Sequence, residues 1–478
     1  TKSVPYDWGY GSTPRIAKLR DTLYWKASTT KEWIHVAAGV GKCSFRKGQA
    51  IKIDLDRARL VTRAYRDTEG QSWTLRRAKM VEKLCAEYYA ESGRPGIPPG
   101  VYFRMIFIGY FEGIGSQRGI AWRCADSLSL REFLGVDATQ RTPDHSSLTV
   151  IRKRLPIEVY YDVFTFVLKL AEKKGFFRGK IAGIDATLLE ANAAMKSIVR
   201  RDTGDDWKEY VKKLAAEEGV EIENDEDLRR FDKKRKNKKV SNKEWTSPTD
   251  PDSRIMRMKD GRTHLSYKAE HAIDLETDLA TAAEIYSGDE SDGDTLARTA
   301  ERAKSNTRKV TGQDRLRDIV ADKGYHKAQA LVDLEALDLR SYIPEREGLY
   351  EHRWTDKPEG HEEAYRANRR RVQGNRSKTL QRLRSEYTER SFAHTCETGD
   401  ARRSWLRGLD EVRKRHLALV AGRNLGVIMR EVFGFGSPRS MQDLALLLST
   451  LRKAFSALSS VLRTPSAPSA GPNLVWAA

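Results

Sequence analysis

Two short apolar runs that each end in an aspartate place the tightest constraint on how this chain can fold. Residues 181–184 precede Asp185, and residues 319–321, at the end of a strand pattern over 317–322, precede Asp322. Each run is too short for a typical helix and predicts a strand that ends at its acid. If the two strands are neighbours in one sheet, both carboxylates emerge at the same edge.

The chain between residues 176 and 435 alternates between strand and helix patterns around these two runs. In chain order it predicts a strand over 181–185, a hairpin over 265–286, a helix over 295–304, a strand over 317–322, a helix to about 337, a strand over 339–343 and a long helix from about 378. The order β-ββ-α-β-α-β-α indicates an α+β or α/β fold with a mixed sheet.

Two polar segments interrupt this order. Residues 195–261 contain an acidic triplet at 225–227 and a basic run at 229–239, so they form either a charged insertion or a flexible basic arm. Residues 345–377 are the second insertion.

The remaining parts of the chain differ in pattern from this mixed region. Apolar residues at helical spacing predict an all-helical domain over 68–175. Residues 1–67 show no sustained period and stay unassigned, and residues 436–478 should form a C-terminal helix and a disordered tail rich in Ser, Pro and Ala.

The charge of the chain indicates its class of partner. Lysine and arginine total 86 against 67 acidic residues, which gives a formal net charge of +19. Such an excess favours a polyanion, with nucleic acid as the first candidate. A hydrophobic content of 39% argues against wholesale disorder.

The cysteines and the apolar stretches exclude other classes. Cys43, Cys85, Cys124 and Cys396 lie far apart, so neither a zinc finger nor a disulfide framework is expected. No apolar stretch is long enough to span a bilayer, and the start of the sequence lacks the order of a signal peptide. We expect a soluble cytoplasmic protein associated with the nucleoid.

Three acids are the candidates for chemistry: Asp185, Asp322 and Glu389. Apolar residues follow Glu389 at three, four and seven positions, so we expect it on the helix face that packs on the sheet. An unpaired carboxylate there would be costly, and a divalent cation removes the cost. Mg²⁺, or Mn²⁺ in its place, prefers oxygen ligands, and two such ions can activate a water or a 3′-hydroxyl against a phosphodiester.

Each acid also has a structural interpretation. An aspartate at a strand end is commonly a turn or cap residue. Glu386 and Glu397 compete for the place of Glu389. The acids between residues 289 and 294 precede a helix, where capping and the helix dipole explain them; a separate metal site is the alternative.

Motifs spread along the chain occur in a characteristic order. They are residues 99–102, 109–114, 142–148, 183–187 (GIDAT), 190–193, 252–254, 321–325 (ADKGY), 389–393 (ERSFA), 406–409 and 424–425. Over roughly residues 70–435 the chain thereby resembles the DDE transposases of bacterial insertion sequences, which have a catalytic domain like ribonuclease H.

The resemblance implies a function and a set of site residues. Asp185, Asp322 and Glu389 would be both the catalytic residues and the ligands of two Mg²⁺ ions per active site. The partners would be double-stranded DNA with terminal inverted repeats and target DNA, bound by a homodimer or a larger assembly. Residues 68–175 would bind the DNA ends, or their helices would serve in dimerisation or as a scaffold. Residues 176–435 would be the catalytic domain.

One departure from the family pattern concerns a lysine six or seven residues beyond the glutamate. This chain has Thr395 and Cys396 there, so Arg402 or Arg403 would have to supply the DNA contact.

Further DNA contacts are expected on three segments. Lys233, Lys234, Arg235 and Lys236 are candidates for phosphate binding, or else form a solvated arm. Trp354 could hold an extruded base or anchor local packing. His326 could contact phosphate or water, or act as a cap.

The activity itself has two alternatives. A nuclease of the same fold would cut DNA without strand transfer. A catalytically idle descendant would act as a DNA-binding repressor.

Overall fold

The computed structural model describes three strands before residue 40 and most of the chain from residue 81 to residue 437. The described ranges are 16–19, 22–26, 33–37 and 81–437, the last without residues 91, 93–95, 138, 237–239, 346–353 and 356. The helix and tail that we expect from residue 436 onward lie almost wholly outside these ranges.

The chain divides into two compact units. One comprises residues 1–72, 125–140 and 442–478, and the other comprises residues 73–124 and 141–441. In the first unit, strands β1 (Ile16–Leu19), β2 (Thr22–Lys26) and β3 (Trp33–Ala37) form an antiparallel sheet in this order. We had assigned no element there. Helix α5 (Leu128–Leu134) also belongs to this unit.

The second unit begins with a helical region, as the sequence predicted. Its helices are α3 (Pro99–Glu112), α4 (Gln117–Asp126), α6 (His145–Arg154) and α7 (Ile157–Lys173). The carboxylate of Asp144 accepts the backbone N–H of Ser146 at 2.9 Å and so caps the first turn of α6. None of the helices in the described part of the chain has the length and apolar character that a membrane span requires.

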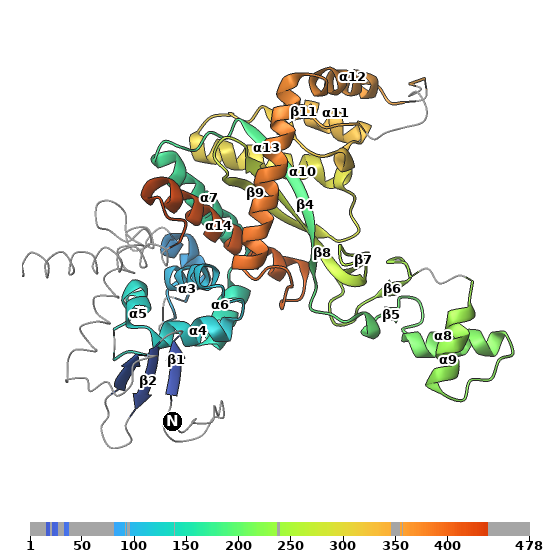
Figure 1. Cartoon of the computed structure of the whole chain (residues 1–478), viewed down its shortest axis with the longest axis horizontal. Helices are drawn as coiled ribbons and strands as arrows, with labels where there is room; N and C mark the ends of the chain where they lie inside the picture. Colours follow the sequence, from blue (N-terminus) through green and yellow to red (C-terminus); the bar gives the residue numbers. More distant parts are fainter. Residues whose placement is uncertain are drawn as a thin grey trace, which may run out of the picture. The chain divides into compact units, whose positions relative to one another are not determined.

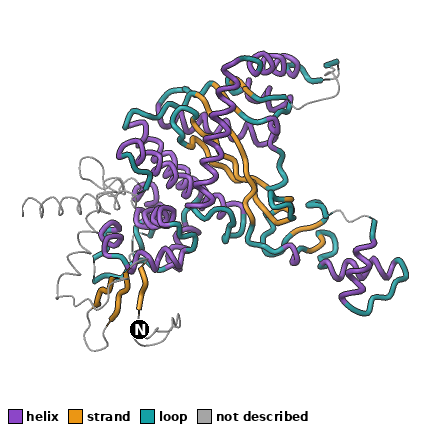
Figure 2. The backbone as a smooth tube through the Cα atoms, in the orientation of Figure 1, coloured by secondary structure: helices purple, strands orange, loops and turns teal. Residues whose placement is uncertain are grey.

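A mixed six-stranded sheet forms the centre of this unit (Figures 1 and 2). Its strands are β4 (Ile181–Glu190), β7 (Arg254–Arg257), β8 (Thr263–Asp274), β9 (Ala280–Ser287), β10 (Asp318–Val320) and β11 (Arg340–Tyr342). The order is β11-β10-β4-β8, and both β7 and β9 pair with the free side of β8. Strand β10 is parallel to β4 and β11, whereas β8 is antiparallel to β4. The mixed α/β class is therefore confirmed.

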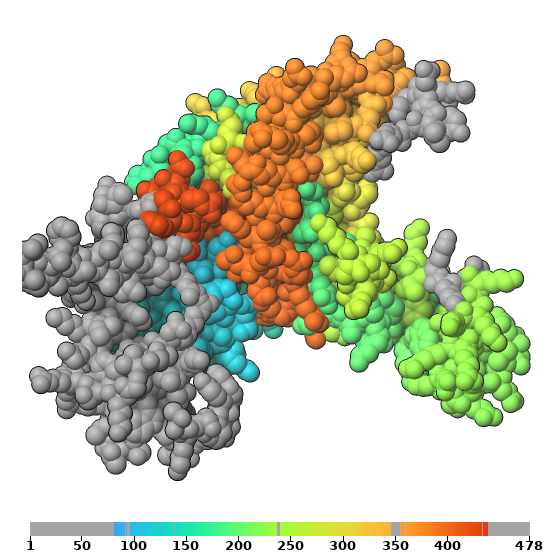
Figure 3. All heavy atoms as spheres, in the orientation of Figure 1, coloured from blue at the N-terminus to red at the C-terminus, as the bar shows by residue number. Residues whose placement is uncertain are grey.

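Helices cover both faces of the sheet. They are α10 (Asp292–Thr311), α11 (Ala328–Ala336), α12 (His361–Val372), α13 (Asn375–Ala393) and α14 (Leu409–Phe433). On one face, Ile184 and Ala272 pack with residues of α10 and α11. On the other, Tyr267 and Ile285 pack with Val412 of α14, and Val320 packs with Leu380 of α13. In the space-filling view α13 lies at the surface across the sheet (Figure 3).

Strand β4 is longer than its apolar run. We predicted that the strand ends at Asp185, but it continues to Glu190 because β8 pairs with it all along, from Ala182 opposite Asp274 to Glu190 opposite Ser266. The prediction of a strand end was therefore wrong. Asp185 lies in the middle of β4.

The polar segment over 195–261 folds and is not a flexible arm where the structure describes it. Strands β5 (Val199–Arg200) and β6 (Trp245–Thr246) pair, and helices α8 (Trp207–Glu217) and α9 (Asp225–Lys234) lie between them, apart from the sheet (Figure 2). The acidic triplet forms the first turn of α9, whose N-cap is Asn224. In the second insertion, α12 takes up residues 361–372.

Candidate active site

The register of two parallel strands places Asp185 and Asp322 side by side. Gly183 of β4 lies opposite Val320 of β10. Each aspartate lies two residues further along its strand or just beyond it, so both reach the same position across the sheet. The charge on Asp322 acts to raise the pKa of Asp185, as expected of two neighbouring carboxylates.

Hydrogen bonds hold the carboxylate of Asp185 from three sides. Its Oδ1 accepts the backbone N–H of Ala186 at 2.8 Å. Its Oδ2 accepts Nη1 of Arg384 at 3.0 Å and the hydroxyl of Thr388 at 3.2 Å, both from α13. Burial raises the pKa of Asp185, and Arg384 opposes that effect.

A third carboxylate reaches the same edge of the sheet from α10. Asp322 Oδ1 accepts the N–H of Gly324 at 2.7 Å. A Cβ on Gly324 would lie 2.8 Å from Asp322 Oδ1 and 3.1 Å from Asp292 Oδ2, so a side chain there would press on both acids. Asp292 also forms an ion pair of 2.7 Å with Lys268, which is buried. Asp292 therefore begins α10 and also lies beside Asp322 and Lys268.

Glu389 directly follows Thr388 in sequence, but its side chain is exposed on α13. The face of α13 turned to the sheet carries Leu380, Arg384 and Thr388, at intervals of four residues. Our expectation that Glu389 lies on the packed face was wrong. The apolar residues that follow it were misleading because Ala393 is exposed and Cys396 lies in a turn of π-helix over residues 394–398, so of the three only Phe392 packs from α13 itself.

The helix that carries Glu389 is fixed to the turn between β8 and β9. Asp278, in that turn, has a left-handed backbone with φ of 61°. Its carboxylate accepts Arg390 of α13 at 3.2 Å and also binds Arg423 of α14. Asn424 bonds the backbone of Ala280 on the adjoining strand. The predicted motif at 424–425 therefore has a structural role here.

Two buried histidines, His271 and His416, lie beside Asp185. His271 lies opposite Asp185 in the register of β4 and β8. Its Nε2 lies 2.7 Å from Nε2 of His416, and its Nδ1 lies 3.0 Å from the hydroxyl of Ser391. Burial lowers the pKa of His271 well below the usual range and that of His416 to about 3. The pair joins the sheet to α13 and α14 without adding charge.

Arg384 and Thr388 were not predicted as site residues, and Asp292 was interpreted as an acid that caps a helix. The first two could have been found from the spacing of Leu380, Leu383 and Tyr387, because a helix that packs through these residues turns 384 and 388 the same way. Asp292 offered no such signal, since four acids precede or begin the same helix.

Two more of the sequence motifs, at 252–254 and 406–409, contact each other in the structure. Asp250 is buried, and its Oδ1 accepts the hydroxyl of Tyr267 at 2.6 Å and the N–H of Gly408 at 3.0 Å. Oδ2 of Asp252 accepts the N–H of Leu409 at 2.9 Å, which caps the first turn of α14. The motifs at 252–254 and 406–409 are far apart in sequence but contact each other at the start of α14.

The basic run lies at the end of α9, within the insertion. Lys233, Lys234 and Lys236 are exposed. Arg235 is bound instead: it bonds Asp232 and lies 5.8 Å from the ring centre of Tyr210.

His326 and Trp354 come together around one aromatic ring. The ring centre of Tyr365 lies 5.4 Å from that of His326 and 5.0 Å from that of Trp354. Trp354 also packs against the apolar cluster between the sheet and α10 and α11. The packing role that we set beside base binding is therefore observed.

Arg402 and Arg403 are exposed and lie near the end of β4. Arg402 pairs with Glu397 at 3.4 Å and Arg403 with Glu190 at 3.6 Å. Glu190 is five residues beyond Asp185 on an extended strand, which corresponds to about 17 Å.

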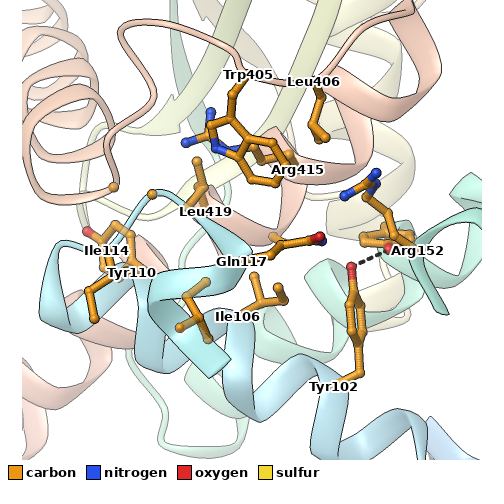
Figure 4. A pocket seen from close by; sticks show the side chains of 15 residues that line it. Tyr102, Ile106, Tyr110, Ile114, Gln117, Arg152, Trp405, Leu406, Arg415 and Leu419 are labelled. Atoms are coloured by element: carbon orange, nitrogen blue, oxygen red, sulfur yellow. Dashed lines mark hydrogen bonds between the residues drawn. The ribbon is translucent and has the colours of Figure 1, made fainter. Parts of the chain in front are cut away.

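A cavity of about 30 Å³ lies between the N-terminal helices and the segment before α14 (Figure 4). Arg152 Nη1 and Trp405 Nε1 are buried there and have no hydrogen-bond partner. The space suits one or two water molecules and not a nucleotide.

The acids at the sheet edge fit a divalent cation in their chemistry. Within the part of the chain that the structure describes, no three His, Cys, Asp or Glu side chains already surround one point as metal ligands would. Asp185 and Asp322 nevertheless supply carboxylate oxygens at neighbouring positions, the ligand type that Mg²⁺ prefers, and Mg²⁺ commonly takes only one or two carboxylates from a protein.

Comparison with known families gives two matches. "Transposase domain (DUF772)" matches residues 74–154, and "Transposase DDE domain" matches residues 240–452. The first match lies over the helical region, and the second contains Asp322 and Glu389 but begins after Asp185. No curated protein and no solved structure matches the chain.

Proposed function

The chain belongs to the DDE transposases of insertion sequences, and from this premise we propose that it cuts and joins DNA at the ends of its own element. It would bind the terminal inverted repeats, hydrolyse phosphodiesters there and join the freed 3′-hydroxyls to target DNA. Residues 68–175 would bind the ends, and residues 176–435 would be a catalytic domain of the ribonuclease H type. The strand order β11-β10-β4-β8-β9 supports that fold.

One observation carries the proposal: the register of β4 and β10 that sets Asp185 beside Asp322. These two residues would hold Mg²⁺, or Mn²⁺ in its place, with two ions per site. Bound divalent cations activate the attacking water or 3′-hydroxyl and stabilise the leaving oxygen. The matched DDE region contains Asp322, and the strand register that sets Asp185 beside Asp322 supports Asp185.

The chain's own groups prepare the site. Thr388 and the N–H of Ala186 fix the orientation of the Asp185 carboxylate. Gly324 leaves room for Asp322 beside Asp292. Glu389 would complete the set from the exposed side of α13, and the ion pair of Arg390 with Asp278 holds that helix in register.

DNA would contact residues outside the site. The candidates are those predicted from the sequence: Lys233, Lys234, Arg235, Lys236, His326, Trp354, Arg402 and Arg403. The lysines of α9 favour contacts to phosphate, which carry little sequence information.

A strand-transfer assay tests the proposal. Full-length protein is incubated with Mg²⁺, a plasmid target and a precut duplex that carries the inverted repeat flanking the gene. We expect joining of the 3′-hydroxyl to the plasmid, and no joining with Asp322→Asn. Cutting without joining would reassign the protein as a nuclease, and binding without either reaction would indicate a repressor.

The proposal also fixes a stoichiometry. One recognisable set of acids per chain and two ends to be joined imply at least two chains on a pair of ends. Mass photometry of the protein with end-containing duplexes should show two or more chains per complex. An active complex of one chain with two ends would contradict this.

A further inference from the structure

Arg384 occupies a place that the proposed function does not explain. It extends from α13 to Oδ2 of Asp185 at 3.0 Å, and its side chain is 13% exposed. The carboxylate that the proposal assigns to a cation is thus already bonded to a cation of the chain itself.

The stem of Arg384 is fitted to the sheet. A Cβ on Gly183 would lie 2.9 Å from Cγ and 3.3 Å from Cβ of Arg384, so the glycine lets the arginine lie directly on β4. The side chain approaches Asp185 along the strand, over the residue two positions before it.

The guanidinium is only partly satisfied at this place. Its Nε is buried without a hydrogen-bond partner, and Nη1 shares Oδ2 of Asp185 with the hydroxyl of Thr388. The side chain of Asp185 is 30% exposed, so another ligand can reach the carboxylate that Arg384 bonds.

We propose that Arg384 is an internal counter-ion of the Asp185 carboxylate, which competes with a divalent cation for Oδ2 and so sets the affinity of the site for metal. This inference deepens the proposed function and rests on it. The positive charge beside Asp185 weakens binding of a second positive charge, and the hydrogen bond to Oδ2 is broken when metal takes that oxygen. The contact also keeps two neighbouring acids, Asp185 and Asp322, from facing each other without a cation.

The test is Mn²⁺ binding by the full-length, metal-free protein, measured by isothermal titration calorimetry without DNA. We expect Arg384→Gln to bind Mn²⁺ roughly tenfold more tightly than wild type. Arg384→Met keeps an apolar stem over Gly183 and should behave alike, so the result does not depend on one variant folding. Arg384→Lys keeps the charge and should stay near wild type.

The matched control is Arg382→Gln, which removes the same charge from an exposed position of the same helix. It should leave the affinity for Mn²⁺ within about twofold of wild type, because an exposed charge is screened by water and salt. If Arg384→Gln and Arg384→Met bind Mn²⁺ no more tightly than wild type, or if Arg382→Gln matches their gain, the counter-ion role is wrong.

A separate variant distinguishes this failure from a failure of the proposed function. Asp185→Asn should abolish or strongly weaken Mn²⁺ binding. If it does, and the Arg384 variants do not gain affinity, only the counter-ion role falls. If Asp185→Asn binds Mn²⁺ as wild type does, the metal assignment itself falls, and the counter-ion role with it.

Discussion

Two of the contacts between an aspartate and an arginine that tie the helices of one face to the sheet differ in burial. Asp278 binds Arg423, whose side chain is 0% exposed, and also receives Arg390. Asp185 binds Arg384, but its own side chain is 30% exposed and a second acid, Asp322, acts on it. We call the buried pair of Asp278 and Arg423 at the hairpin turn the closed lock, and the partly exposed pair of Asp185 and Arg384 at the sheet edge the open contact.

The difference shows that two ion pairs of the same residue types can differ in how easily one partner is replaced. Arg423 binds both the carbonyl and the carboxylate of Asp278, in a turn whose backbone the pair helps to hold. A buried pair of this kind is costly to break because one charge is left without its partner. At Asp185 water and other ligands can reach the carboxylate, so its partner can be exchanged.

The largest expected effect is the loss of DNA cleavage when an aspartate at the open contact or beside it is replaced. Asp185→Asn and Asp322→Asn should each lower DNA cleavage by roughly 10³-fold or more, because ligands of one site act as a unit. Binding to DNA ends should persist, since neither residue reads DNA. Cleavage of an end-containing duplex with Mg²⁺, alongside a gel-shift assay, measures both.

The stability of Asp185→Asn has a defined sign. Burial raises the pKa of Asp185, so the folded state holds this proton more tightly than the unfolded chain. Its contribution to folding then decreases as the pH rises from the ordinary pKa of aspartate through the raised value. The variant should equal or exceed wild type in free energy of unfolding at pH 7. A large loss would place Asp185 with Asp278 as a lock.

Glu389 extends the same comparison along α13. Glu389→Gln should abolish cleavage, whereas Glu386→Gln, at the exposed residue that pairs with Arg390, should retain it. A cleavage assay of both variants decides between them. Activity in Glu389→Gln together with its loss in Glu386→Gln would reverse the assignment.

The closed lock should respond in stability. Arg423→Met leaves Asp278 without its main partner and should lower the free energy of unfolding by about 3–5 kcal/mol. Chemical denaturation at pH 7 measures this. Arg384→Met is the matched variant at the open contact and should lose clearly less. Equal losses would remove the distinction between the two contacts.

The smallest effect lies outside both contacts, on the basic run of α9. Neutralising Lys233, Lys234, Arg235 and Lys236 together should weaken binding to all DNA by roughly tenfold and flatten its salt dependence, because phosphate contacts release counterions. The preference for end sequences should stay. Binding assays at several salt concentrations check this, and an unchanged slope would make the run a solvated surface.

The spacing of apolar residues within each single segment predicted most of the helices and strands. The hairpin, α10, α11 and the strand before Asp322 were predicted because their apolar spacing follows the local structure. The sequence also predicted the neighbouring strands that bring Asp185 and Asp322 together.

The remainder depended on contacts between distant segments. The length of β4 is set by its pairing with β8, which no local pattern reveals. The orientation of Glu389 was mistaken because Ala393 is exposed and Cys396 lies in a π-helical turn, and Arg384 was missed because its partner lies 199 residues away.

The pairing of β5 with β6 has a consequence for how this chain can change over time. Val199 lies opposite Thr246, so the insertion leaves and rejoins the domain at one point. A graft, a deletion or a replacement between these two residues would need only a short turn to close the gap. The segment is therefore a module that related chains could exchange or lose while the sheet and its acids stay in place.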